Sequence, residues 1–132
     1  YMPFSRDGNT IYLSGHLPQL ADGTLIKGRL GEDLSIEEGQ YAARLATMNL
    51  LASLRAAAAG DLDKIDKIVR VSGFVNSTST FTSQAQVMNG CSDVIGEIFG
   101  VEIGRHARSA IGVNVLPLGV PVEIEAIVRL KN

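Results

Sequence analysis

The segment from Val120 to Leu130 constrains the fold of this chain more than any other. Its residues alternate between two kinds. The apolar set comprises Val120, Val122, Ile124, Ala126, Val128 and Leu130. The other set is Glu123, Glu125, Ile127 and Arg129. Because successive side chains of a strand point to opposite faces, this alternation predicts a strand with one face in a core and the other face uncovered by that core.

A helix predicted from Ser35 to about Ala59 can cover the apolar face. Ser35-Ile36-Glu37-Glu38 has the pattern of a capping box, and Gly60 stops the helix. Large apolar residues recur at helical spacing and predict its buried stripe. They are Tyr41, Leu45, Met48 and Ala52, widened by Leu51 and Leu54.

A second helix is predicted from Phe81 to Phe99, with N-cap hydroxyls from the loop 76–80. Its buried face is predicted to hold Val87, Cys91, Val94, Ile95 and Ile98. Strands are predicted at 9–14, entered through a turn at 6–8, at 67–75, and for a short stretch near 24–27. The order strand, helix, strand, helix, strand, strand in 132 residues predicts one α+β domain spanning 1–132.

The last two strands, 107–115 and 120–130, are predicted to form a hairpin closed by a type I turn at 116–119. That pairing sets Arg108 opposite Ile127, Ala110 opposite Glu125 and Gly112 opposite Glu123. Arg108 and Glu123 then share the helix-free face, about 13 Å apart at the backbone. Ala110 and Gly112 lie between them, so the pattern predicts a site for a small molecule.

Arg108 needs an anion, because an unpaired buried guanidinium is costly. Glu125 is diagonal to it in the predicted hairpin and is one candidate, as a structural cross-strand ion pair. The carboxylate of a ligand is the other. A bulge at Gly112 would shift the pairing by one residue. The residues alone leave both alternatives open.

Composition excludes several function classes. The formal net charge is −2 and only 5% of residues are aromatic, which disfavours nucleic-acid binding. No apolar stretch is long enough to span a membrane. His16 and His106 lack partners at metal-ligand spacing, so we expect no metal site and read His106 as part of a solvated turn. The single cysteine, Cys91, fits the core of a cytoplasmic protein.

The predicted helix-free face is partly apolar, which favours a contact between subunits. We expect Ala110, Gly112, Leu116 and Ile127 on this face, whereas Ser109 should point into the core.

Two motifs resemble those of a known family. The segment HARSAIGVNVLPLGVPVEIEAIVRL resembles the C-terminal signature of the Rid family, also called YjgF or RidA-like, and NTIYLSGHLP resembles its N-terminal strand motif. The resemblance implies a chorismate-mutase-like fold, with a mixed sheet and two helices on one face, and a homotrimer with clefts between subunits. The best-understood family members hydrolyse reactive enamines and imines, such as 2-aminoacrylate, to a 2-keto acid and ammonia, and we expect no cofactor for this reaction. Some members carry the older label endoribonuclease L-PSP.

The resemblance also implies roles for individual residues. Arg108 matches the arginine that binds the substrate carboxylate, and Glu123 matches the glutamate that places water or moves a proton. Ser14 and Gly15 match a pair that lines the cleft, and Tyr1 falls at the position of a cleft tyrosine.

The GRHARSAIGV version of the motif resembles a separate subgroup of the family, and the chain departs from the common pattern at two places. Ala110 stands where many members have a cysteine, so a thiol-dependent activity is not expected. Asn89 matches the cleft asparagine, although the segment from Phe81 to Arg108 is longer than in typical deaminases.

Three functions follow as hypotheses. The first is an imine deaminase in which Arg108 and Glu123 are catalytic and Tyr1, Ser14, Gly15, Asn89 and Ala110 contact the substrate. The second is a non-catalytic binder of a small carboxylate-bearing ligand. The third, less favoured, is an endoribonuclease. All three expect a homotrimer and no membrane partner.

Overall fold

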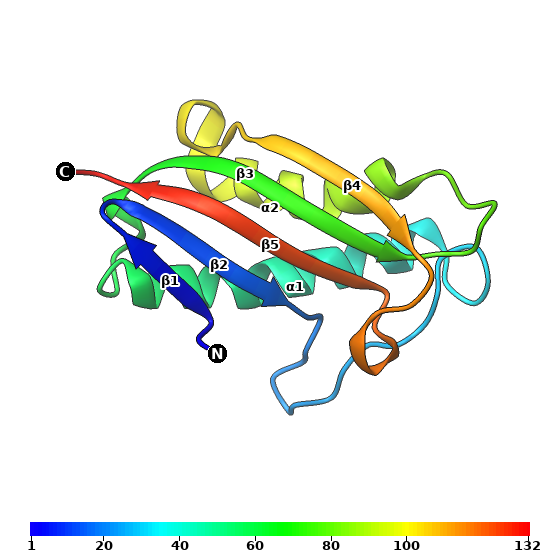
Figure 1. Cartoon of the computed structure of the whole chain (residues 1–132). Coiled ribbons are helices and arrows are strands. Elements are labelled where there is room, and N and C mark those ends of the chain that lie inside the picture. Colours follow the sequence, from blue (N-terminus) through cyan, green and yellow to red (C-terminus); the bar gives the residue numbers. More distant parts are fainter.

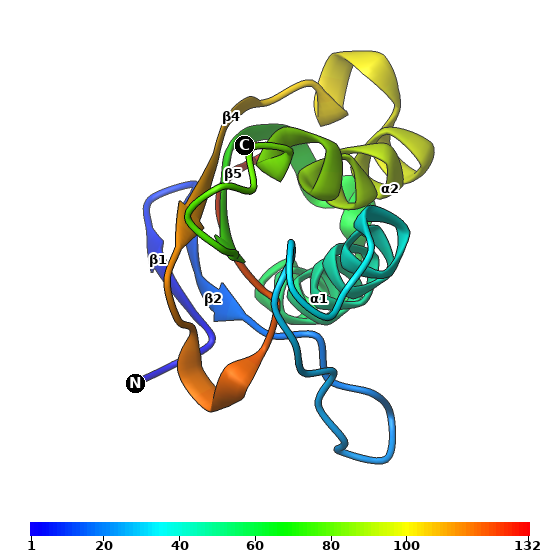
Figure 2. The same ribbon diagram turned by 90° about the vertical axis from the view of Figure 1, so that its right-hand side faces the viewer.

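In the computed structural model, residues 1–132 form a five-stranded mixed sheet with two helices against one face. The strand order is β1-β2-β5-β3-β4, and only β3 and β4 are parallel. The strands are β1 (Phe4–Asp7), β2 (Thr10–His16), β3 (Ile65–Asn76), β4 (Ala107–Val113) and β5 (Val122–Leu130). The helices α1 (Ile36–Ala57) and α2 (Gln84–Gly104) lie on the same side of the sheet (Figures 1 and 2). The predicted α+β class is confirmed.

The strand β1 was not predicted from the sequence, whereas its partner β2 was. β1 pairs antiparallel with β2, and Asp7 lies opposite Thr10. Gly8 takes the turn with a φ of 61°, a conformation that favours glycine. The predicted short strand near 24–27 is wrong, because that segment forms only an isolated bridge between Gln19 and Leu25.

Helix α1 begins as predicted. The Ser35 hydroxyl accepts a hydrogen bond from the main-chain N–H of Glu38 (3.1 Å), and the Glu38 carboxylate accepts one from the N–H of Ser35 (3.0 Å). This reciprocal pair satisfies two donors that the first turn of a helix leaves without partners. The capping box is confirmed.

The predicted buried stripe of α1 is wrong in part. Tyr41 is 57% exposed and Met48 46% exposed, although Leu51 and Leu54 are buried. The face against α2 and the sheet is instead dominated by small residues. They are Gly39, Ala42, Ala43, Ala46 and Thr47. Small side chains allow the two helices to approach closely, and Tyr41 and Met48 remain outside this contact.

Helix α2 departs from its prediction at both ends. It begins at Gln84, and its N-cap residue Ser83 makes no side-chain capping bond, so capping by the hydroxyls of the 76–80 loop is wrong. It ends at Gly104 after a break at Gly100, where φ is 75°. Ile98 is 46% exposed rather than buried, whereas Cys91 is buried as predicted.

The predicted hairpin between the last two strands is wrong. β4 pairs in parallel with β3, with Arg108 opposite Val71. β5 lies on the other side of β3, with Ala126 opposite Val71. The segment after β4 forms a 3-10 turn at Pro117–Gly119, where Leu118 has a φ of 59°. Helix α2 returns the chain to the start of β3, and a strand that follows such a crossover runs parallel to the first.

The two faces of β4 are therefore the reverse of the prediction. Arg108 bonds to α2, and Ala110 packs against the core. A side chain at Gly112 would meet Ser77 and Gln84 on the same helix-covered side. Ser109 does not point into the core, because its hydroxyl accepts a hydrogen bond from Arg70 (2.6 Å).

The helix-free face is partly apolar as predicted, but different residues form it. Ala110, Gly112 and the buried Leu116 do not belong to the exposed apolar surface predicted there. Ile127 is half-buried, and Ile111 on β4 is 49% exposed.

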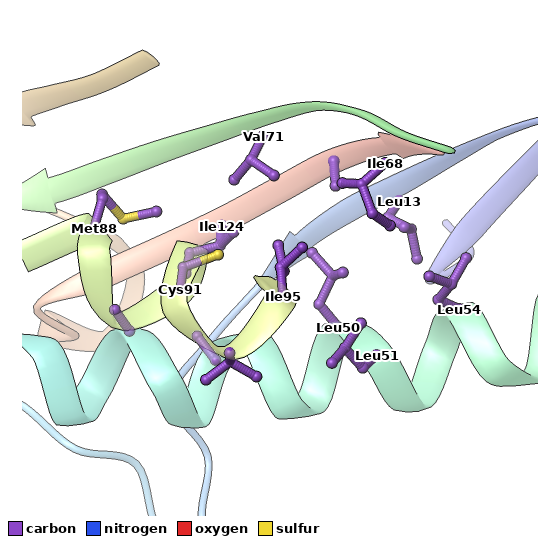
Figure 3. Packing of buried hydrophobic residues seen from close by; sticks show 14 of the residues in the cluster. Leu13, Leu50, Leu51, Leu54, Ile68, Val71, Met88, Cys91, Ile95 and Ile124 are labelled. Atoms are coloured by element: carbon purple, nitrogen blue, oxygen red, sulfur yellow. The ribbon is translucent and has the colours of Figure 1, made fainter. Parts of the chain in front are cut away.

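The core lies between the sheet and the two helices. The apolar set of β5 from Val122 to Leu130 is buried, so the predicted split of this strand is confirmed. Figure 3 shows Leu50, Leu51 and Leu54 of α1 beside Leu13 and Ile68 of the sheet, with Cys91 and Ile95 between the layers.

Candidate functional site

A group of polar side chains lies where β4, one of the two edge strands, meets α2. We call it the edge cluster; it comprises Asn89, Ser92, His106 and Arg108. Nη1 of Arg108 donates to Asn89 Oδ1 (3.0 Å) and to Ser92 Oγ (3.1 Å), and Nη2 donates to the carbonyl of Ala85 (3.4 Å). The structure thus brings two sequence-predicted site residues, Arg108 and Asn89, into contact.

Ser92 and His106 were not predicted to take part in this group. Ser92 Oγ lies 2.9 Å from His106 Nε2, and His106 Nδ1 lies 2.7 Å from the carbonyl oxygen of Gly104. His106 is therefore half-buried and bonded at both ring nitrogens rather than free in a solvated turn. Its position two residues before Arg108 was visible in the sequence, but the role of Ser92 depends on how α2 packs against β4.

A cavity of about 370 Å³ opens beside the edge cluster. Its lining includes Ser92, His106 and Arg108, together with Arg105 and three glycines of α2. No carboxylate lines it, so the cavity suits an anionic ligand better than a cationic one.

Arg108 has no acidic partner within the chain. The two ion pairs of the structure join Arg44 to Glu97 and Arg129 to Asp66. The predicted structural pair of Arg108 with Glu125 is wrong, because β3 lies between β4 and β5 and the two side chains start from opposite faces of the sheet.

A second group forms near the N-terminus. We call it the N-terminal cluster; it comprises Tyr1, Ser14, Gly15 and Glu123. Tyr1, Ser14 and Gly15 line a second cavity of about 370 Å³. The Ser14 hydroxyl donates to the carbonyl of Met2 (2.6 Å), which holds the N-terminal segment against β2. A side chain at Gly15 would overlap the Glu123 side chain, so the glycine leaves room for the Glu123 carboxyl beside β2.

Glu123 has an unusual environment for a carboxyl group. It is half-buried and forms no ion pair. Burial raises the pKa of its carboxyl above the ordinary value, and the negative charge of Glu125 raises it further. A carboxyl group with a raised pKa can exchange protons near neutral pH more readily than an ordinary glutamate.

The two clusters do not meet within one chain. Arg108 projects from the helix-covered side of β4, and Glu123 from the opposite side of β5. The two strands are separated by β3, which puts them about 9.6 Å apart. The predicted arrangement of Arg108 and Glu123 on one face of a hairpin is therefore wrong. Ala110 stays with Arg108, two residues along β4 on the same face.

Cys91 and His16 are two further titratable side chains whose surroundings shift their pKa. Burial raises the pKa of the Cys91 thiol to about 11, which keeps it protonated and unreactive. His16 bonds to the carbonyl oxygen of Ser14 and to the Ser53 hydroxyl, and burial lowers its pKa. No three His, Cys, Asp or Glu side chains lie close enough together to hold a metal ion. Neither helix has the length and apolar composition needed to cross a membrane.

Comparison with known proteins identifies the family. The protein-family model described as "YjgF/chorismate_mutase-like, putative endoribonuclease" matches residues 1–127 of this chain. Protein TCP17 of Trypanosoma cruzi is 43% identical over 132 residues, which are 100% of this chain and 82% of that protein. The crystal structure of Atu1372 from Agrobacterium tumefaciens, a protein of unknown function, has 43% identity and a TM-score of 0.95 over 98% of this chain and 82% of that one. A crystal structure named as a putative endoribonuclease, from Shewanella oneidensis, has 37% identity and a TM-score of 0.92 over 98% and 85%. The chain therefore belongs to the YjgF/chorismate-mutase-like family, as its C-terminal motif indicated.

Proposed function

We propose that this protein hydrolyses small enamines and imines that carry a carboxylate, in a cleft between copies of the chain. The observation that carries the proposal is the bonding of Arg108. All three of its hydrogen bonds go to neutral acceptors, and none uses Nε. The edge formed by Nε and Nη2 is the edge that donates two parallel hydrogen bonds to a carboxylate.

The separation of the two clusters supports a site between subunits. A ligand held by Arg108 of one chain cannot reach Glu123 of the same chain, because the sheet lies between them. A second copy placed against β4 would supply the N-terminal cluster. The partly apolar helix-free face supports such assembly, and the homotrimer is the form that the family resemblance implies.

The proposed reaction needs no cofactor. Arg108 holds the carboxylate, and the main chain near Gly15 helps to hold the imine. A water molecule adds its oxygen to the imine carbon, and Glu123 takes a proton from that water and gives it to the nitrogen, which forms a carbinolamine. Glu123 then takes the hydroxyl proton of the carbinolamine and gives it to the amine nitrogen. The C–N bond breaks, ammonia leaves, and the carbonyl of a 2-keto acid forms. Positioning and proton transfer suffice, because the C=N carbon is already electrophilic.

The test compares Arg108→Lys with the unmodified protein in ammonia release from 2-imino acids generated in situ. Lysine keeps the charge but not the planar pair of donors. Loss of one charge-assisted hydrogen bond, worth about 1.5–3 kcal/mol, should slow turnover at low substrate by roughly tenfold to a hundredfold. The thermal melting temperature should change little, because no carboxylate of the chain depends on Arg108.

Arg44→Lys is the matched control, since Arg44 forms an exposed ion pair on α1. It should leave turnover unchanged. If Arg108→Lys lowers stability while turnover is unchanged, Arg108 is structural and the proposed site is wrong.

Two other functions remain as outcomes of this test. Binding of a keto acid without acceleration of any imine would show a non-catalytic binder in the same cleft. The endoribonuclease named for relatives predicts RNA cleavage that disappears with Arg108→Lys. The net charge of −2 and the low aromatic content make RNA the less favourable ligand. We place the activity in the cytoplasm, in keeping with the free Cys91.

A further inference from the structure

The edge cluster contains a chain of hydrogen bonds whose direction can be deduced from its two ends. Arg108 Nη1 can only donate, so Ser92 Oγ must accept its bond (3.1 Å). At the other end, the Gly104 carbonyl can only accept, so His106 Nδ1 must carry the hydrogen that joins them (2.7 Å). The neutral imidazole then has an unprotonated Nε2, which faces Ser92 Oγ at 2.9 Å.

The Ser92 hydroxyl makes no hydrogen bond to the main chain of α2, so it can link Arg108 to His106. A helical serine commonly donates its hydroxyl hydrogen to the carbonyl four residues earlier. Ser92 forms no such bond, and its only partners are Arg108 and His106. Its single hydrogen therefore goes to His106 Nε2, so the hydrogen bonds run from Arg108 through Ser92 and His106 to Gly104.

This series of hydrogen bonds holds only the Nη1 end of the Arg108 guanidinium. Both hydrogens of Nη1 are used, by Asn89 Oδ1 and by Ser92 Oγ. Nε has no partner, and the bond of Nη2 to Ala85 is the longest of the three at 3.4 Å. With Nη1 held, the edge made of Nε and Nη2 keeps one orientation toward the ligand.

We propose that Ser92 and His106 are positioning residues that hold Arg108 for a bidentate carboxylate. The inference rests on the proposed function for its ligand, but the hydrogen-bond chain itself can be tested without any ligand. His106 acts through Ser92 and Ser92 acts through Arg108, so neither needs to touch the substrate.

The ligand-free test is NMR spectroscopy of the full chain. The Nη1 and Nη2 groups of Arg108 should give separate nitrogen signals at low temperature, because the held guanidinium rotates slowly. The two signals should merge in Ser92→Ala and in His106→Ala, and remain separate in Ser92→Thr, which keeps the hydroxyl. Neutral His106 should carry its hydrogen on Nδ1. Identical Arg108 signals in Ser92→Ala and the unmodified protein, or a neutral His106 with its hydrogen on Nε2, would overturn the proposal.

The chain offers a matched control in Ser53. His16 lies between the Ser14 carbonyl oxygen (2.6 Å) and the Ser53 hydroxyl (2.8 Å), the same arrangement as at His106. No arginine bonds to Ser53, so Ser53→Ala removes an equivalent bond without reaching Arg108. The two Arg108 signals should stay separate in this variant. Their merging would mean that they respond to a general loss of rigidity in the protein and not to the hydrogen bond from Ser92.

The second measurement is the affinity for pyruvate, used as a carboxylate probe. Ser92→Ala should weaken binding about threefold to tenfold, and Ser92→Thr should restore it to within about twofold. Unchanged affinity in Ser92→Ala, with affinity lost in Arg108→Lys, would overturn the positioning role and leave the proposed function standing. If pyruvate binds equally well to Arg108→Lys, the proposed function fails, and the NMR result alone decides the inference.

Discussion

At the scale of single residues, Glu123 and Arg108 are each left incomplete by their own chain. Arg108 has only neutral acceptors, and Glu123 is a half-buried carboxyl without a cation. In most folded proteins such groups are paired, because a partly buried charge without a partner costs stability. Their presence at the two clusters is what distinguishes these positions from ordinary surface polar residues.

The raised pKa of Glu123 leads to a prediction about stability and pH. A carboxyl whose pKa is higher in the folded state than in the unfolded state favours folding below the unfolded pKa, and this contribution is lost as the pH rises through the folded pKa. At neutral pH the ionised Glu123 therefore opposes folding. Glu123→Gln should melt at a higher temperature than the unmodified protein at pH 7, and the difference should shrink toward pH 4. Thermal melts across this range check the prediction.

Glu125→Gln is the appropriate comparison, because Glu125 is exposed and affects Glu123 only through its charge. Burial is the larger cause of the pKa shift, so Glu125→Gln should give the smaller gain at pH 7. A gain for Glu123→Gln that is the same at pH 4 and pH 7 would contradict the role of ionisation.

At the scale of elements, the close packing of α1 against α2 depends on Gly90. A methyl group at this position would overlap the main-chain carbonyl of Gln40 on α1. Backbone cannot move aside as a flexible side chain can, so Gly90→Ala must push the helices apart. We expect a loss of about 1–3 kcal/mol in the free energy of unfolding, measured by urea denaturation.

Gly96→Ala tests the same chemical change in the same helix. A methyl group at Gly96 meets nothing within 4 Å. Alanine is the better helix former, so this variant should be more stable by up to about 1 kcal/mol. Equal effects at the two positions would show that helix propensity, and not helix contact, decides the outcome.

At the scale of the whole molecule, the helix-free face of the sheet is the surface on which assembly is expected. Ile127 is half-buried there and Ile111 is 49% exposed. If the proposed homotrimer forms and its subunits cover this face, Ile127→Glu buries a charge and should weaken the assembly. Light scattering should then show a loss of trimer mass for Ile127→Glu at micromolar concentration.

An exposed apolar residue of α1, Met48, provides the control for this prediction. Met48 is 46% exposed on the outer side of the helix layer. Met48→Glu should leave the mass of the assembly unchanged. Dissociation by Met48→Glu alone would place the interface on the helices, and a stable monomer of the unmodified chain would exclude the assembly altogether.

Local features of the sequence were sufficient to predict both helices, the strands β2, β3, β4 and β5, and the family, but they did not predict β1. The capping box at Ser35 and the alternation along β5 are properties of neighbouring residues, and both appear in the structure as expected. The C-terminal motif indicated the family, because it preserves residue types at fixed spacing. Arg108 and Asn89 were identified in the same way, and they lie in contact.

The arrangement of the elements was decided only by the tertiary structure. A short connection between two apolar segments favours a hairpin, but it cannot reveal that β3 occupies the place between β4 and β5. Because β4 pairs with β3 and not with β5, Arg108 lies on the side of the sheet that faces α2 and is separated from Glu123 by β3. Helical spacing likewise could not tell whether Tyr41 or Ala43 faces inward, because the choice depends on how closely α2 approaches. Alternation and periodicity report which residues share a face, whereas contacts between distant segments determine what that face meets.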